Sequence, residues 1–123
     1  MKRVLAVGLD PIYADLSQFP EFNAEMVTAY IKQQIDSVRK LGFEVVDCLI
    51  STDPEGLKQV EAALKAQEFD CVMIGAGLRE PPELLLLFER VLNAVHRLAP
   101  QAAICFNSSP ADSAEAVQRW IKP

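Results

Sequence analysis

Four short apolar runs alternate along the chain with segments of helical periodicity, and this alternation constrains the fold more than any other feature. The runs cover residues 4–9, 44–50, 70–75 and 102–106. When strands and helices alternate in this way, each helix carries the chain back across the sheet, so that the strands lie parallel with helices on both faces. The sequence therefore predicts a three-layer α/β fold built on a four-stranded parallel sheet.

The second apolar run differs from the other three. Its sequence, EVVDCLI, contains Glu44 and Asp47, whereas the other runs are apolar on both pleat faces. Strands that are buried on both faces belong in the interior of a parallel sheet, so we place the second strand at an edge. This predicts the strand order 2-1-3-4, a flavodoxin-like or Rossmann-like arrangement that lacks the fifth strand.

Helix starts are signalled by polar residues before the helical segments. Asn23 is a predicted N-cap, Asp53 precedes a proline at the first helical position, and Ser109 with Asp112 forms a predicted capping box. The third helical segment, residues 82–99, has an apolar face covering about half of its circumference. Leu86 falls in the middle of its polar face, as a plain surface residue or a contact for a partner.

Size and charge limit the domain organisation and the partners. With 123 residues, half of them apolar, the chain is long enough for one hydrophobic core, and we expect a single domain over residues 1–123. The net charge is -5 and the basic residues are scattered, which argues against nucleic acid or a membrane as the main partner. The first apolar run is too short for an export signal, so we expect a cytoplasmic protein.

No motif for a cofactor, a metal or a catalytic nucleophile is present. Cys48, Cys71 and Cys105 lie singly in apolar segments and are expected to be reduced core residues, and no zinc-ligand spacing or P-loop occurs. The only histidine, His96, is predicted to lie far from the strand ends. We therefore predict no cofactor and no metal, the catalytic residues are unknown, and the sequence leaves open whether the chain is an enzyme.

A ligand site in such a sheet is expected beyond the carboxyl ends of the strands, where the strand order reverses between strands one and three. The loop after strand one is long and contains Tyr13, Phe19 and Phe22, which either cover the site as a lid or fill the rim of the core. The residues that we expect to contact a ligand are Asp10, Gly75, Gly77, Arg79, Glu80, Asn107 and Ser108.

Arg79 is the sharpest candidate among them. It follows a buried strand and precedes a helix, and a guanidinium placed there can hold a carboxylate or phosphate. The alternative is that Arg79 pairs internally with Asp10 or Glu80. Asp10 itself either contacts a ligand or caps its own turn, and Gly75 and Gly77 either admit a ligand or serve the backbone.

The segments IGAGLREPPELLLLFERVLNAVH and ICFNSSPADSAEAVQRW resemble a small family of uncharacterised bacterial α/β proteins with no assigned activity. The resemblance implies a shared fold and supplies no substrate. Our functional hypothesis is therefore a domain that binds a small anionic molecule at the strand ends. The alternative is a non-enzymatic interaction module that dimerises or docks through the edge of the fourth strand, Leu86 or the aromatic loop. We expect a homodimer through the fourth strand unless the terminal helix with Trp120 covers that edge.

Overall fold

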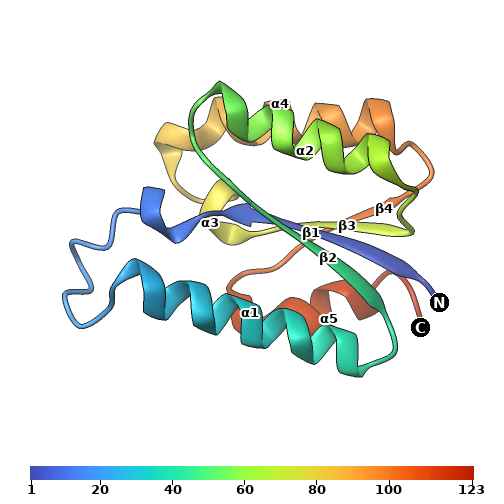
Figure 1. The fold of residues 1–123 in the computed structure, drawn as a ribbon, viewed down its shortest axis with the longest axis horizontal. Coiled ribbons are helices and arrows are strands. Elements are labelled where there is room, and N and C mark those ends of the chain that lie inside the picture. Colours follow the sequence, from blue (N-terminus) through green and yellow to red (C-terminus); the bar gives the residue numbers. More distant parts are fainter.

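The computed structural model describes all 123 residues and confirms the predicted three-layer α/β fold. Figure 1 shows α2 and α4 on one face of the sheet and α1 and α5 on the other. The strands are β1 (Arg3–Leu9), β2 (Glu44–Ile50), β3 (Cys71–Ile74) and β4 (Ala103–Phe106). The helices are α1 (Ala24–Lys40), α2 (Pro54–Ala66), α3 (Ala76–Arg79), α4 (Leu85–Leu98) and α5 (Ser113–Gln118). Single 3-10 turns are η1 (Pro11–Tyr13), η2 (Pro82–Leu84) and η3 (Pro110–Asp112).

The sheet has the predicted order, β2-β1-β3-β4, and all of its strands are parallel. β1 is central and pairs with β2 over its whole length and with β3 over residues 4–7. Glu44 and Asp47 are exposed on β2, which is why that strand suits the edge. The carboxyl ends of β1 and β3 lie next to each other and form the point at which the strand order reverses.

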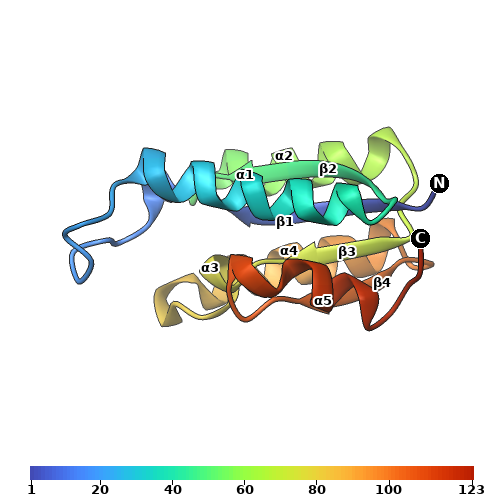
Figure 2. The same cartoon turned by 90° about the horizontal axis from the view of Figure 1, so that it is seen from below.

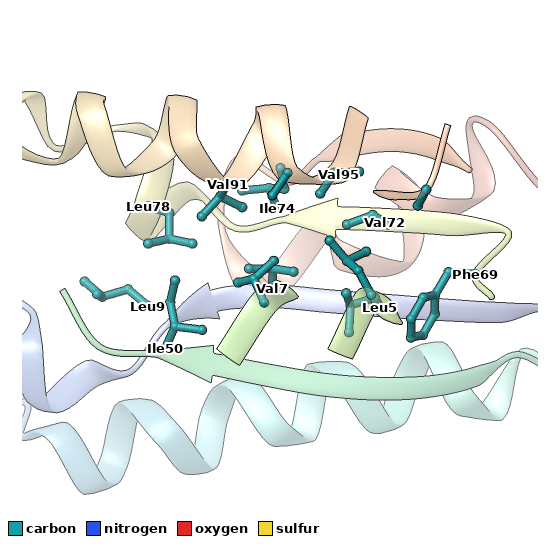
Figure 3. Packing of buried hydrophobic residues seen from close by; sticks show 14 residues of the cluster. Leu5, Val7, Leu9, Ile50, Phe69, Val72, Ile74, Leu78, Val91 and Val95 are labelled. Carbon is teal, nitrogen blue, oxygen red and sulfur yellow. The ribbon is translucent and has the colours of Figure 1, made fainter. Parts of the chain in front are cut away.

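Two hydrophobic clusters of different composition cover the two faces of the sheet. The cluster beneath α2 and α4 has 14 buried residues and is built largely from leucine, isoleucine and valine. Figure 3 shows Ile74, Val91 and Val95 of this cluster meeting between β3 and α4. The cluster beneath α1 and α5 has 11 buried residues, including Ala6, Met73 and two cysteines. Figure 2 shows α1 and α5 lying side by side across this second face.

The predicted helix caps are confirmed. Asn23 accepts a hydrogen bond from the backbone N–H of Met26 at 2.8 Å, and Asp53 accepts one from Glu55 at 3.0 Å. Ser109 and Asp112 form the reciprocal capping box at η3. These bonds satisfy backbone donors that the first helical turn cannot pair. Gly42, at φ 106°, ends α1 in the left-handed conformation that favours glycine.

The start of α2 packs against the backbone of the loop that precedes it. A Cβ added at Gly56 would lie 2.0 Å from the carbonyl oxygen of Ser51. No side chain fits in that space, so the close approach of the helix to the end of β2 requires glycine at this position.

The chain between β3 and α4 differs in detail from the prediction. The segment expected as a loop contains the short helix α3, because Leu78 is fully buried and holds that turn against the sheet. The helix expected over residues 82–99 begins as the 3-10 turn η2 and becomes α-helical at Leu85. Leu86 is exposed on α4, as its position in the polar face predicts.

The terminal segment packs on one face of the sheet but does not pair with the outer edge of β4. Trp120 is 63% exposed, and β4 pairs with β3 alone, so its outer edge is open. Arg119 donates a hydrogen bond to the carbonyl of Phe106 at 2.9 Å, at the end of the strand only. None of the helices is both long enough and apolar enough to cross a membrane.

Candidate functional site

A cavity of about 210 Å³ lies at the carboxyl ends of the strands, between the sheet and α1, at the point where the strand order reverses. We call it the strand-end cavity. Its floor comes from β1, β3 and the residues that follow them, and its walls come from η1, α1 and the start of α5. The residues that line the cavity include Ala6, Gly8, Leu49, Met73, Gly75 and Asn107, with Val27 and Ile31 from α1.

The cavity lies where the residues of β1 on this face of the sheet become smaller towards the end of the strand. Along β1 the residues facing α1 are Val4, Ala6 and Gly8, and β3 runs in the same direction to Gly75. The opposite face keeps leucine and isoleucine to the end of the strands. Because Gly8 and Gly75 have no side chain to fill the volume beneath α1, a space remains between this helix and the sheet.

Asn107 forms the polar corner of the cavity. Its side chain is 5% exposed, and its Oδ1 accepts a hydrogen bond from the backbone N–H of Ala76 at 2.9 Å. Its Nδ2 donates to the hydroxyl of Ser113 at 3.1 Å, and that hydroxyl donates to the carbonyl of Pro110 at 2.7 Å. An amide nitrogen carries two hydrogens, so one N–H of the Asn107 side chain has no partner within the protein.

Arg79 lies outside the cavity lining, on the side of the sheet that α4 covers. Its guanidinium carbon is 5.8 Å from the centre of the Phe106 ring, and its Nη2 donates to the carbonyl of Asn107 at 3.0 Å. The same nitrogen is 3.6 Å from a carboxylate oxygen of Glu80. The internal pairing that the sequence left open is therefore with Glu80, and Asp10 takes no part in it.

The other predicted site residues fall into two groups. Gly75, Gly77 and Asn107 line the cavity, so three of the seven are brought together there. Asp10 caps its own turn, accepting from the N–H of Ile12 at 3.2 Å, and Ser108 donates to Asp112 in the capping box. Glu80, Asp10 and Ser108 all lie at the strand ends but outside the lining.

The long loop after β1 contributes to the cavity with small residues and not with its aromatic ones. Pro11 and Ala14 line the cavity wall. Tyr13, Phe19 and Phe22 are each about half exposed, and Figure 1 shows the loop extending away from the body of the domain. The aromatic side chains thus neither close over the cavity nor fill the rim of the core.

The cavity offers apolar contact and hydrogen bonds. None of the lining residues has a side chain that titrates near neutral pH, and the one hydroxyl, that of Ser113, is already donated to Pro110. General acid–base chemistry needs a titratable group within hydrogen-bond reach of the substrate. The lining therefore suits binding and selection of a ligand. Elsewhere, no three His, Cys, Asp or Glu side chains gather as potential metal ligands.

The loops around the cavity carry the net charge of the chain. Residues 10–23, 51–53, 75–84 and 107–112 contain seven carboxylates and one cation, Arg79. Because the whole chain has 17 acidic and 12 basic residues, ten acidic and eleven basic residues remain for the rest. These segments therefore carry a net charge of -6, from one cation and seven carboxylates, which disfavours the approach of an anion.

Most of the cavity lining was not predicted from the sequence, because these residues are apolar and resemble ordinary core residues. The floor residues Ala6 and Gly8 and the wall residues Val27 and Ile31 are all apolar. The decreasing size of alternate residues in VLAVG was the available signal, since alternate residues of a strand face the same side.

Comparison of the chain with protein-family models finds no match, and comparison with curated proteins finds none either. The resemblance of residues 74–96 and 104–120 to uncharacterised bacterial proteins therefore stays a prediction.

Proposed function

We propose that the chain is a binding module for a small, largely apolar molecule that occupies the strand-end cavity. The observation that carries the proposal is the position of an apolar cavity at the reversal of strand order, where open parallel sheets bind their ligands. An apolar cavity of about 150 Å³ in another protein holds benzene. A cavity of about 210 Å³ therefore suits one aromatic ring or branched aliphatic group with a short substituent.

The polar corner defines the substituent. Asn107 has one amide hydrogen free for an acceptor, and it lies among backbone atoms of Gly75 and Ala76. A hydroxyl, carbonyl or amide oxygen on the ligand would meet this donor. The hypothesis of an anionic ligand stays a prediction, but Arg79 does not support it from its present position, and the surrounding carboxylates oppose it.

A thermal-shift comparison of ligands with the same ring tests the proposal. Benzyl alcohol and benzamide are neutral, benzoate carries the negative charge, and inorganic phosphate represents an anion without a ring. A neutral ligand present at about ten times its Kd should stabilise the protein by about 1.4 kcal/mol, which is several degrees in Tm. Benzoate should stabilise it less, and phosphate should not stabilise it at all.

Gly75→Val is the matched variant for this experiment. Gly75 has φ -74° and ψ 153°, which a β-branched residue adopts readily, and an added Cβ has no atom nearer than Val7 O at 3.5 Å. The larger side chain would occupy the cavity and remove the ligand-induced shift. Val91→Ala, in the opposite cluster, should lower Tm and preserve that shift.

Two results would count against the proposal. Equal stabilisation of wild type and Gly75→Val would place binding outside the cavity, and no stabilisation by any ring compound would leave the cavity without a ligand of this class. Preference for benzoate over benzamide, lost in Arg79→Ala, would instead support the anion hypothesis.

A homodimer formed through β4 is the second candidate, and the open outer edge of that strand favours it. Unpaired backbone groups on an edge strand pair readily with a second strand. Light scattering after size exclusion should then show a dimer. A monomer at high protein concentration would contradict this candidate.

A further inference from the structure

Exposed apolar side chains gather in one stretch of the chain. Eleven large hydrophobic residues are exposed, and six of them fall within residues 12–30. Scattered exposed residues need no explanation, but a cluster marks an interaction surface. Aromatic residues and methionine are the types enriched at protein interfaces. The six are Ile12, Tyr13, Phe19, Phe22, Met26 and Tyr30.

This stretch, which we call the rim segment (residues 10–31), is held in shape by local hydrogen bonds. η1 begins on the Asp10 cap, the N–H of Phe19 donates to Leu16 at 2.9 Å, and the N–H of Phe22 donates to Phe19 at 2.9 Å. Asn23 then caps α1. The aromatic rings of Phe19 and Phe22 lie 6.3 Å apart. Successive turns thus present the rings to solvent in a defined arrangement, which lowers the entropy lost on binding.

The rim segment is acidic throughout. It contains four carboxylates, Asp10, Asp15, Glu21 and Glu25, and no lysine or arginine. This charge repels nucleic acid and anionic lipid surfaces and attracts a basic protein surface. The occupant must therefore combine positive charge with exposed apolar side chains.

The opposite end of the same chain has this combination. Residues 39–42 and 119–123, which we call the basic end, contain four cations, Arg39, Lys40, Arg119 and Lys122, and no carboxylate side chain. Arg39 is paired with Asp36 at 2.6 Å, so Lys40, Arg119 and Lys122 supply the positive charge of this surface. Trp120 is 63% exposed between two of these cations, and Leu41 is also exposed. The two parts of the basic end touch, because a Cβ at Gly42 would lie 3.3 Å from Pro123.

The two surfaces of one copy cannot meet each other. The rim segment lies at the start of α1 and the basic end at its finish, and 17 helical residues span about 25 Å. Figure 1 shows the loop of the rim segment and the carboxyl terminus at opposite ends of the molecule. Contact between them therefore requires two copies.

We propose that the rim segment of one copy binds the basic end of the next, so that the chain associates head to tail. The proposal does not depend on a ligand in the strand-end cavity. Such a contact is heterologous, and it leaves one free surface of each kind at the two ends of every oligomer. Assembly therefore continues beyond the dimer, as rings or open filaments, and weakens as salt screens the charges.

Sedimentation velocity with complementary variants tests the proposal. The rim variant, Phe19→Ser/Phe22→Ser, removes the aromatic part of the rim segment. The basic-end variant, Trp120→Ser/Lys122→Ser, disables the basic end. All four positions are exposed, so both variants should keep the fold, which circular dichroism would verify. Wild type should form species larger than a dimer as its concentration rises, and these should dissociate at about 1 M salt. Each variant alone should be a 13.6 kDa monomer.

An equimolar mixture of the two variants is the decisive sample, because it restores one intact contact per pair. It should contain a dimer and nothing larger. Leu86→Ser, at an exposed apolar position outside both surfaces, should assemble like wild type. Three results would overturn the proposal. The wild type could stay monomeric at every concentration, or the mixture could contain no dimer. The wild-type assembly could also stop at two copies and persist in both variants. If Phe19→Ser/Phe22→Ser unfolds, Asp15→Lys/Glu21→Lys replaces it as the variant of the rim segment, with the same expected results.

Discussion

Asn107→Ala removes the side chain that joins the end of β4 to the starts of α3 and α5. Two hydrogen bonds disappear, one from the N–H of Ala76 at 2.9 Å and one to the hydroxyl of Ser113 at 3.1 Å. A hydrogen bond contributes about 1 kcal/mol net, and a buried donor left without a partner costs about 1–3 kcal/mol more. We therefore expect the free energy of unfolding to fall by about 3 kcal/mol, a large part of the stability of a domain of this size.

Urea denaturation followed by circular dichroism measures this loss. With a slope of about 1.5–2 kcal/mol per molar urea, the midpoint should fall by about 1.5–2 M. Asn93→Ala is the matched control, because Asn93 is exposed on α4 and donates only to the Glu89 carbonyl within its own helix. Its effect should stay within about 0.5 kcal/mol.

The pair Asn107→Ala and Ser113→Ala refines the test. If the two side chains act through their shared hydrogen bond, the double variant should be about 1 kcal/mol more stable than the sum of the single losses implies. An Asn107→Ala variant that is as stable as Asn93→Ala would refute the reasoning. It would mean that the three elements hold together without their polar connection.

Three further predictions concern backbone packing and ionisation. Gly56→Ala should lower the free energy of unfolding by about 3 kcal/mol, because the added Cβ would overlap the backbone of Ser51. Gly77→Ala should stay within about 1 kcal/mol of wild type, because its added Cβ has no atom nearer than 3.6 Å. Equal urea midpoints for the two variants would contradict this prediction. The hydrogen bond from the Ser108 hydroxyl lowers the pKa of Asp112 in the folded state, so its stabilising contribution is present above about pH 4 and is lost as pH falls further. Unfolding of Asp112→Asn should accordingly depend less on acid than that of wild type, and parallel profiles would argue against this account. Burial raises the pKa of the Cys48 thiol to about 11, so iodoacetamide at pH 8 should modify it about two hundredfold more slowly than a free thiol, with the rate still rising above pH 9. A rate that levels off near pH 9 would indicate an ordinary pKa.

The fold was predictable because its signals are local and repeated. The acidic residues in EVVDCLI identified the edge strand, and Asn23, Asp53 and Ser109 identified helix starts through caps that the structure contains. Each signal depends on a few neighbouring residues, and each agrees with the others. The short helix α3 escaped prediction because its stability comes from the burial of Leu78 against the sheet and not from its own four residues.

The candidate site was predictable in position and not in composition. The rule for parallel sheets located it at the strand ends, where Gly75, Gly77 and Asn107 line the cavity. The direction of the Arg79 side chain depends on the Phe106 ring, which lies 27 residues away in sequence and reaches it only through the pairing of β3 with β4. Such a contact has no signature within either segment.

The decreasing size of the side chains along one face of β1 separates the residues that stabilise the fold from those that set the space for a ligand. The side chains at positions 5, 7 and 9 belong to the close-packed cluster beneath α2 and α4, whereas positions 6 and 8 lie on the opposite face of the strand, at the strand-end cavity. Residues 7 and 9 border the cavity as well. Substitutions at positions 5, 7 and 9 change the stability of the domain, and modest enlargements at positions 6 and 8 change the volume available to a ligand. A single strand could therefore acquire a new ligand preference by exchanging every other residue, while the alternate residues keep the domain stable.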